Sequence, residues 1–295
     1  MTFRPALRPG APLLRRDQAS LQIGTSPGVV IADRPGLMAL LRLADGTRDV
    51  ERLQSYARAN IPELDCEVAP LMHQLRALGV VFDSSHWSAP HRRGLDAEAR
   101  HTDLAGGELA RLTQRPLFRV AFHTDAATEP IAAAARTVLG SAGIRDLDSN
   151  DPDLLVIASC GEPARTVFER PQLAALDHLV VMIDEDRVRI GPLVRPGRTP
   201  CMSCYDLHRA DWDHAWGALL PQLGRHTGIL TPAALDAVTV HGAALEIAIE
   251  VLAHCDGGPT RTIGQFLAVG PGHSERSGWP LAFHHGCACD LLSAA

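Results

Sequence analysis

Hydrophobic positions follow two different patterns along this chain, and the first lies near the N-terminus. Short apolar stretches separated by turn residues predict three strands there, over Leu13–Arg16, Ser20–Ile23 and Val29–Ile31. Three segments with apolar residues at helical spacing follow, and a short apolar run closes the region: Arg34–Leu43 with Asp33 as its cap, Asp49–Asn60 capped by Thr47 or Asp49, Asp65–Leu78, and finally Val80–Phe82. This order of strands and helices predicts a winged-helix-like module.

From Leu117 onward the pattern is typical of an α/β domain. Two continuous apolar runs, Leu154–Ala158 and Leu179–Ile183, resemble strands that a parallel sheet buries on both faces. The other predicted elements are strands over Phe118–Phe122, Val188–Val194, Phe266–Val269 and Leu281–Phe283, a helix over Pro130–Leu139, and the longest helix over Ala233–Leu252, with Thr231 as its cap and Pro232 in its first turn. We therefore divide the chain into a module over 1–83, a polar linker over 84–115 and an α/β domain over 116–295.

Composition and charge narrow the classes of function. The 295 residues are 46% hydrophobic and 21% charged, which is ordinary for a chain that buries a core. A net charge of −6 gives no strong electrostatic case for nucleic acid or an anionic membrane as a partner. We find no signal peptide and no stretch that approaches the roughly 20 apolar residues of a membrane span. We expect a cytoplasmic protein whose seven cysteines are reduced thiols or metal ligands.

All 28 basic residues are arginine, and the chain contains no lysine. A Schiff-base lysine, a P-loop lysine and a lysine general base are therefore excluded. A GC-rich genome is the simplest cause of this bias. Phosphate binding through arginine stays open.

Two cysteine pairs carry the strongest chemical signal: Cys201-Met-Ser-Cys204, and Cys287-Ala-Cys289 near the C-terminus. Zinc prefers four soft donors at tetrahedral corners, and four thiolates without an open position define a structural site. The alternatives are a redox pair, which a thioredoxin-like strand-and-helix setting should accompany, or four unrelated core thiols. We interpret the neighbouring His284 and His285 as packing or surface residues that are also able to support a ligand, and the three remaining cysteines as core residues: Cys66, Cys160 and Cys255.

The segment from Arg189 to Trp216 resembles one family closely. It contains Gly-Pro-x-x-x-Pro-Gly-x-x-Pro-Cys-x-x-Cys followed by Leu-His-Arg, and the chain ends in a His-His-Gly-Cys-Ala-Cys run. Both resemble the ThiF-like (ubiquitin-activating-enzyme-like) partner proteins of YcaO-type cyclodehydratases, which serve thiazole/oxazole-modified peptide biosynthesis; His285 stands where that family has proline. The resemblance implies a Rossmann-like α/β domain with structural zinc, a homodimer, and no ATP chemistry in this chain.

The N-terminal module is similar to the family's recognition element for the leader of a ribosomally made precursor. The string Leu-Ala-Asp-Gly-Thr-Arg-Asp-Val between the first two helices adds to that likeness. The resemblance implies that an extended leader peptide joins the edge of a sheet. We place this groove between Val29–Ile31 and the Asp65–Leu78 helix, with candidate residues Val29, Val30, Ile31, Met72, Leu75 and Arg76. For each of these residues, a simple core role is the alternative.

The loop after the first α/β strand bears on catalysis. Active members of the wider fold need a glycine-rich loop there so that the backbone can approach a triphosphate. Here the segment from His123 to Pro130 has no glycine, and Asp125 and Glu129 would repel phosphate. We expect no adenylation site and no catalytic residue.

Three functions therefore compete. The leading one is a non-catalytic subunit that presents a leader peptide to a separate YcaO-type enzyme. The second is an adenylating enzyme that activates a carboxyl group. The third is a winged-helix transcription regulator, which the balance of ten Arg against nine Asp plus Glu in residues 1–90 disfavours.

Overall fold

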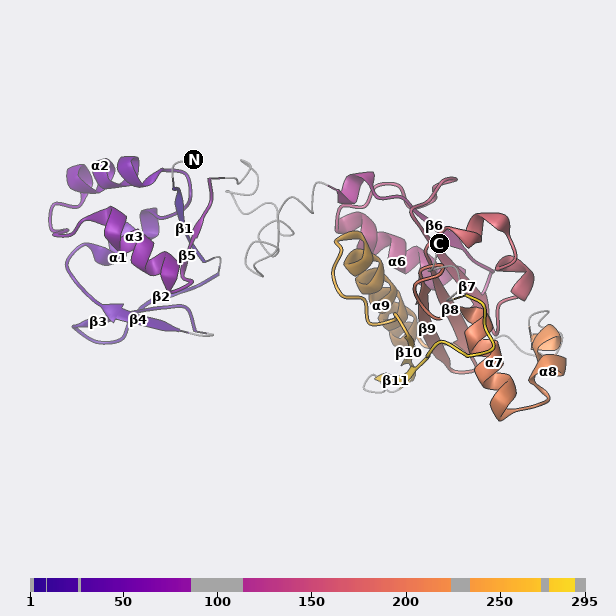
Figure 1. The fold of residues 1–295 in the computed structure, drawn as a ribbon. Coiled ribbons are helices and arrows are strands. Elements are labelled where there is room, and N and C mark those ends of the chain that lie inside the picture. Colours follow the sequence, from indigo (N-terminus) through magenta and orange to yellow (C-terminus); the bar gives the residue numbers. More distant parts are fainter. Residues whose placement is uncertain are drawn as a thin grey trace. The chain divides into compact units, whose positions relative to one another are not determined.

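The structure is a computed structural model, and it describes residues 3–8, 10–25, 28–85, 114–223, 234–271 and 276–289. The chain forms two compact units, Met1–Leu109 and Ala110–Ala295. The division falls inside the segment 84–115 that the sequence predicts as a linker. Most of that segment, like the predicted cap Thr231 and Pro232, lies outside the described residues. Figure 1 shows the elements of both units.

Two small sheets frame the N-terminal unit. Strands β2 (Leu13–Arg15), β3 (Ser20–Ile23) and β4 (Val29–Ala32) form an antiparallel sheet in the order β2-β3-β4. A second antiparallel pair joins β1 (Pro5–Leu7) to β5 (Val81–Asp83). The three consecutive strands confirm the sequence prediction to within one residue. The sequence pattern does not reveal β1, since it is three residues long and begins with proline.

Helices α1 (Leu37–Leu43), α2 (Val50–Asn60) and α3 (Val68–Ala77) complete this unit. The carboxylate of Asp49 accepts the Arg52 N–H at 2.8 Å and caps α2, as the sequence predicts. The predicted cap Asp33 is wrong, because α1 begins after Gly36, which has a φ of 74° that favours glycine. The helices and the three-stranded sheet share a core that buries these side chains: Leu21, Ile23, Leu37, Leu40, Leu41, Leu53, Val68, Met72 and Leu75.

A six-stranded mixed sheet organises the second unit, in the order β11-β10-β9-β8-β7-β6. Its parallel part contains β6 (Val120–His123), β7 (Leu154–Cys160) and β8 (His178–Asp184). Its antiparallel part continues from β8 to β9 (Arg187–Val194), β10 (Gln265–Val269) and β11 (Arg276–Pro280). The prediction of a buried parallel pair at the two continuous apolar runs is thus confirmed for β7 and β8.

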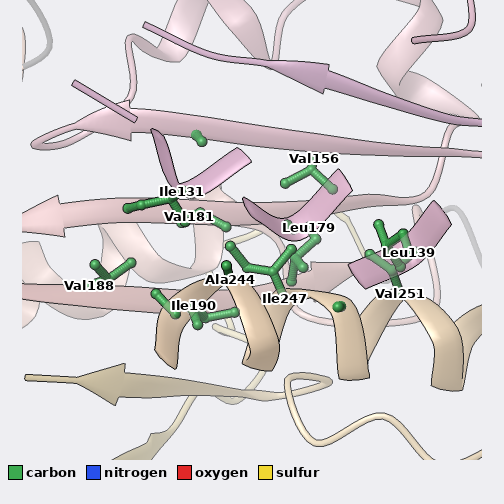
Figure 2. Close-up of a cluster of buried hydrophobic side chains, with 14 of the residues drawn as sticks. Ile131, Leu139, Val156, Leu179, Val181, Val188, Ile190, Ala244, Ile247 and Val251 are labelled. Atoms are coloured by element: carbon green, nitrogen blue, oxygen red, sulfur yellow. The ribbon is translucent and has the colours of Figure 1, made fainter. Parts of the chain in front are cut away.

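Helices cover both faces of this sheet (Figure 1). On one face, α6 (Glu129–Ser141) and α9 (Ala237–Cys255) pack on alternate β8 residues Leu179, Val181 and Ile183, as Figure 2 shows for the labelled residues. On the other, α7 (Met202–Trp212) and α8 (Trp216–Leu223) pack near Val180 and Met182. This alternation explains why β8 reads as an unbroken apolar run. Short 3-10 turns at Arg115–Leu117, Arg165–Val167 and Pro171–Ala174 connect the elements.

Several predicted boundaries in this unit are wrong. The helix predicted from Ala233 begins at Ala237, because the carboxylate of Asp236 accepts the N–H groups of Val238 and Thr239 and caps it. Residues Leu281–Phe283 are not a strand; the strand β11 ends at Pro280. The spacing of four residues between Trp212 and Trp216 predicts one shared helix face, which is also wrong, since α7 ends at Trp212 and α8 begins at Trp216.

Helix α9 is long and apolar enough to cross a membrane by length and composition alone, with 19 residues and a hydropathy of 1.4 in its most apolar window. The sequence expectation that no stretch has this character is therefore corrected. The helix packs on the sheet, where Ala243, Ile247 and Val251 are buried. The buried Glu250 near its end accepts hydrogen bonds from Thr262. These contacts are those of a core helix.

Candidate metal centre and peptide-binding edge

The two cysteine pairs come together in the α/β unit. The Sγ atoms of Cys201 and Cys287 are 3.7 Å apart, those of Cys204 and Cys289 are 3.4 Å apart, and all four sulfurs lie within 4.8 Å of one another. A tetrahedral ion with metal–sulfur bonds of about 2.3 Å separates its sulfur atoms by about 3.8 Å. The cluster therefore has the spacing of a four-coordinate metal site. Because all four donors come from the protein, the arrangement fits a structural ion.

Local backbone structure positions both pairs. Cys201 is the N-cap residue of α7, and the buried Cys204 lies one turn into the helix, so both thiols are near the same helix end. In the C-terminal segment, the Cys287 N–H donates to the His284 carbonyl at 2.9 Å and closes a turn around Gly286. This turn brings the second pair to α7.

The thiols have conflicting tendencies to ionise. Burial opposes ionisation of Cys204, but the His284 N–H, 3.5 Å from its sulfur, and other hydrogen bonds outweigh burial and lower the pKa of this thiol. Burial raises the pKa of Cys287 and of Cys289, and the neighbouring thiols raise that of Cys289 further. A divalent cation removes the conflict, because it stabilises several thiolates at once.

His284 supports the cluster without being one of the four donors. Its side chain is only 5% exposed, and its Nδ1 accepts the Gly286 N–H at 3.0 Å. This bond leaves the ring proton on Nε2, which donates to the Asp211 carboxylate at 2.9 Å. With its backbone N–H directed at Cys204, His284 fixes the turn that carries the second cysteine pair. A supporting role is one of those that the sequence leaves open for His284, and the burial of its ring excludes a surface position.

The N-terminal unit offers an open sheet edge at β4. In the sheet order β2-β3-β4, one side of β4 has no strand partner among the described residues. The Asp33 N–H bonds the Ala19 carbonyl at 2.8 Å, and β4 pairs with β3 in the register Val30↔Gln22. Since antiparallel pairs alternate, the N–H and C=O groups of Val30 and Ala32 point to the open side. The side chain of Val30 is 48% exposed.

The six predicted peptide-binding residues lie in different settings. Val29 and Ile31 are half-buried on the core side of β4, next to the exposed Val30. Met72 and Leu75 are buried in the core at 0% and 1% exposure, so in this structure they support the sheet and do not line a groove.

Arg76 is exposed on α3, where its guanidinium lies 5.2 Å from the Phe3 ring centroid and 3.9 Å from Asp83. Those partners belong to the β1–β5 side of the unit. The opposite flank of α3 carries the half-buried Leu71 and the exposed Leu78. Helical spacing, which places positions 71 and 78 on one stripe, offers a way to find these two residues from the sequence.

The start of α6 is already occupied by the protein's own acceptors. The Asp125 carboxylate accepts the N–H groups of Ala127 at 3.0 Å and Thr128 at 2.9 Å, and that of Cys160, at the end of β7, at 2.6 Å. The Glu129 N–H bonds the Asp125 carbonyl at 3.0 Å, and the next residue is proline. Burial opposes ionisation of Asp125, but the donated N–H groups outweigh it and lower its pKa.

The consequence concerns phosphate binding. A helix start binds phosphate through free N–H groups and a favourable dipole. Between Ala127 and Glu129, each N–H already bonds an oxygen of Asp125, which brings its own negative charge. The sequence identifies Asp125 as a residue whose charge repels phosphate. The structure adds that its carboxylate already accepts the backbone N–H groups that a phosphate would need.

Solved structures with a similar fold place the chain among known proteins. The heterocyclase TruD matches with a TM-score of 0.64 and 15% identity over 97% of this chain and 42% of TruD. A heterocyclase in complex with substrate and cofactor matches with a TM-score of 0.64 and 17% identity over 98% of this chain and 40% of that one. MccB from E. coli, bound to succinimide, matches with a TM-score of 0.58 and 11% identity over 97% of this chain and 99% of MccB.

The chain thus spans about two fifths of the two heterocyclase chains and nearly all of MccB. No protein-family model and no curated protein matches the sequence. The chain shares the fold of TruD and MccB and carries in it a cluster of four cysteines at metal-binding distances.

Proposed function

We propose that this chain is a non-catalytic subunit that binds the leader of a ribosomally made precursor peptide and presents it to a separate YcaO-type cyclodehydratase, which forms azoline rings. The observation that carries the proposal is the open edge of β4. Two outward-facing backbone positions there, Val30 and Ala32, offer hydrogen bonds to an extended peptide. The winged-helix-like nature of this unit and the Rossmann-like nature of the α/β unit stay predictions, as does the pairing of two copies.

The side chains at this edge supply the apolar part of the contact. Val29 and Ile31 are only half-buried, although both pack against the core. An extended peptide beside β4 would cover their remaining exposed surface, at a gain of about 25 cal/mol per Å² of apolar area. Leu71 and Leu78 on α3 are the candidates for a second wall.

The metal belongs to the α/β unit, and we assign it as zinc. Four thiolates in tetrahedral spacing suit Zn²⁺ or an iron–sulfur centre, and Cys201 and Cys204 form a C-x-x-C pair at a helix start. When bound, the ion supplies folding energy and not chemistry. The four cysteines would hold it, and His284 would orient the turn that carries Cys287 and Cys289.

The similarity of the fold to heterocyclase structures supports the proposed role as a peptide-presenting subunit. One of the similar structures is a heterocyclase that holds substrate and cofactor, and the present chain spans 40% of its length. Ring formation then belongs to a separate enzyme, as the resemblance of the Arg189–Trp216 segment implies.

An adenylating enzyme is the second candidate, and one comparison favours it. MccB, which matches over almost its whole length, also has structures with ATP and with MccA. The arrangement at α6 weighs against this candidate, because the Asp125 carboxylate holds the donors that a phosphate needs. Carboxylate-dependent pyrophosphate exchange by the purified chain would favour the adenylating enzyme over our proposal.

The proposal is tested by fluorescence polarisation with a labelled leader peptide, taken from a short Cys/Ser/Thr-rich precursor to be sought among the neighbouring genes. We expect saturable binding with a dissociation constant at or below tens of micromolar. Val30→Pro removes one outward N–H without removing a β3–β4 hydrogen bond and should weaken binding roughly fivefold, since a hydrogen bond is worth about 1 kcal/mol net.

Val30→Thr is the matched control, because it keeps the N–H and the β-branched shape. It should bind within about twofold of the unaltered chain. Equal affinity of the Val30→Pro and Val30→Thr variants, or no binding by the unaltered chain, would refute strand addition at β4.

A further inference from the structure

A second site lies in the α/β unit, between α7 and the antiparallel half of the sheet. It is a cavity of about 670 Å³ whose wall includes Tyr205 and Trp212 from α7, Phe266 from β10 and Trp279 from β11. This volume falls within the ordinary range of ligand pockets, roughly 300–1,000 Å³, and holds a few amino-acid residues. Neither the cysteine cluster nor the β4 edge accounts for it.

Arg209 is the polar group in this cavity that needs a ligand. It is half-buried, its guanidinium carbon lies 4.5 Å from the centroid of the Trp216 ring, and its buried Nε has no hydrogen-bond partner. No carboxylate among the described residues forms an ion pair with it. A buried donor without an acceptor costs free energy that a bound anion recovers.

Two further arginines, Arg187 and Arg189, line the cavity, and both form ion pairs with carboxylates of the protein. The buried Nε of Arg189, like that of Arg209, has no hydrogen-bond partner among the described residues, but the charge of Arg189 is neutralised. The guanidinium of Arg189 donates to the Glu162 carboxylate at 3.0 Å and lies 3.3 Å from the Asp184 carboxylate. Glu162 also accepts the Tyr205 hydroxyl at 2.7 Å. This buried network fixes the floor of the cavity. Since Arg187 pairs with Asp186 at 3.2 Å, Arg209 is the lining arginine that forms no ion pair among the described residues.

Aromatic side chains make the remaining wall. Trp279 stacks on Phe266 with 5.7 Å between ring centroids and an interplanar angle of 19°. Trp212 is 86% exposed although it is the largest kind of apolar side chain. A tryptophan this exposed at the mouth of a cavity is typical of a protein or peptide contact.

We propose that this cavity binds a peptide segment in which a carboxylate lies next to an aromatic or branched apolar side chain. The carboxylate pairs with Arg209, and the apolar side chain packs between Trp212 and Trp279. Asp184 and Glu185, which also line the cavity, disfavour a polyphosphate but accept the N–H groups of a peptide. The carboxylate comes from a peptide C-terminus or from an internal Asp or Glu. This inference does not rest on the proposed function.

The test is an array of random hexapeptides attached through their N-termini, one set with free C-terminal carboxylates and one set amidated, probed with the full chain. We expect enrichment of peptides that place a carboxylate beside an aromatic or branched residue. Signal confined to the free-acid set identifies the C-terminal carboxylate, and equal signal in both sets identifies an internal acidic side chain. No enrichment of such peptides in either set overturns the proposal.

Point variants test whether the enriched peptides bind this cavity or the β4 edge. Arg209→Gln should lower binding of the enriched peptides roughly tenfold or more, because it removes a charged hydrogen-bond donor. Arg145→Gln, at an exposed arginine, is the matched control and should bind like the unaltered chain. Trp212→Ala tests the wall at an exposed position that leaves the fold intact. Unchanged binding by Arg209→Gln and Trp212→Ala overturns the site, whereas loss in Val30→Pro alone shows that the peptides bind β4 instead.

Discussion

Removal of the Asp125 carboxylate should destabilise the α/β unit substantially. The side chain accepts hydrogen bonds from Ala127, Thr128 and Cys160, with the shortest at 2.6 Å. Hydrogen bonds to a charged group contribute roughly 1.5–3 kcal/mol each, and a lost helix cap costs about 1 kcal/mol. The contributions are not additive, and water replaces part of them at this half-buried site. We expect Asp125→Ala to lower the free energy of unfolding by about 3 kcal/mol.

The pH dependence of this effect follows from the lowered pKa of Asp125. A carboxyl group whose folded pKa lies below its unfolded value stabilises the fold fully above the unfolded pKa of about 3.9. The stabilisation disappears as the pH falls through the lower folded pKa. The difference between the unaltered chain and Asp125→Ala should therefore be constant from about pH 7 to pH 5 and shrink below about pH 4.

Urea unfolding, followed by tryptophan fluorescence to which the buried Trp216 contributes, measures this difference. Asp151→Ala is the control, because the Asp151 side chain is 89% exposed and, among the described residues, forms an ion pair with Arg119 alone; it should cost less than about 1 kcal/mol. Millimolar ATP should not raise the unfolding midpoint of the unaltered chain. The reasoning is refuted if both variants lose the same stability, or if ATP stabilises the chain.

Four further outcomes are expected. Cys204→Ser should reduce bound zinc, measured by atomic emission after desalting, to well below one ion per chain and lower the unfolding temperature. His284→Ala should keep the four donors and the backbone N–H bond to Cys204 yet weaken zinc binding about 10- to 100-fold in a chelator competition, because it removes the side-chain bonds to Gly286 and Asp211 that hold the turn. Glu162→Gln should cost about 3 kcal/mol in urea unfolding, since the buried Arg189 loses the charge of its nearer carboxylate and keeps only the partly exposed Asp184 as an ion-pair partner among the described residues. Pyrophosphate exchange should stay at background with or without a peptide carboxylate.

Sequence patterns locate elements well where one physical signal dominates. The strands β2, β3 and β4 lie between clear turn residues, and β7 and β8 are apolar on both faces, so both sets are found within a few residues. Helix starts are less predictable, because several neighbouring residues are able to stand at the N-cap. Helix α1 begins after Gly36 and not after Asp33, and Asp236 caps α9. The strand predicted over Leu281–Phe283 is wrong because Leu281 follows the end of β11. Its side chain is apolar because it is buried in the cluster that α7 and α8 form with the sheet.

For the candidate sites, the spacing of residues along the sequence predicts the functional residues better than their hydrophobicity does. The cysteine pairs are predicted from C-x-x-C and C-x-C spacing, and the structure brings all four sulfurs together. The peptide-binding residues are harder to predict, since the hydrophobic pattern of α3 does not distinguish an apolar residue that faces the core from one that faces a groove. Met72 and Leu75 turn out to be core. The contact between Arg209 and the Trp216 ring depends on the break between α7 and α8, which the sequence pattern does not reveal.

Residue-resolved hydrogen–deuterium exchange of the full chain, with and without the leader peptide, tests strand addition at β4 most directly. The N–H groups of Val29 and Ile31 face β3, whereas those of Val30 and Ala32 face the open edge. We expect the leader to slow exchange at Val30 and Ala32 strongly and at their two neighbours only slightly. Slowed exchange elsewhere in the chain, with β4 unchanged, would contradict the proposed role.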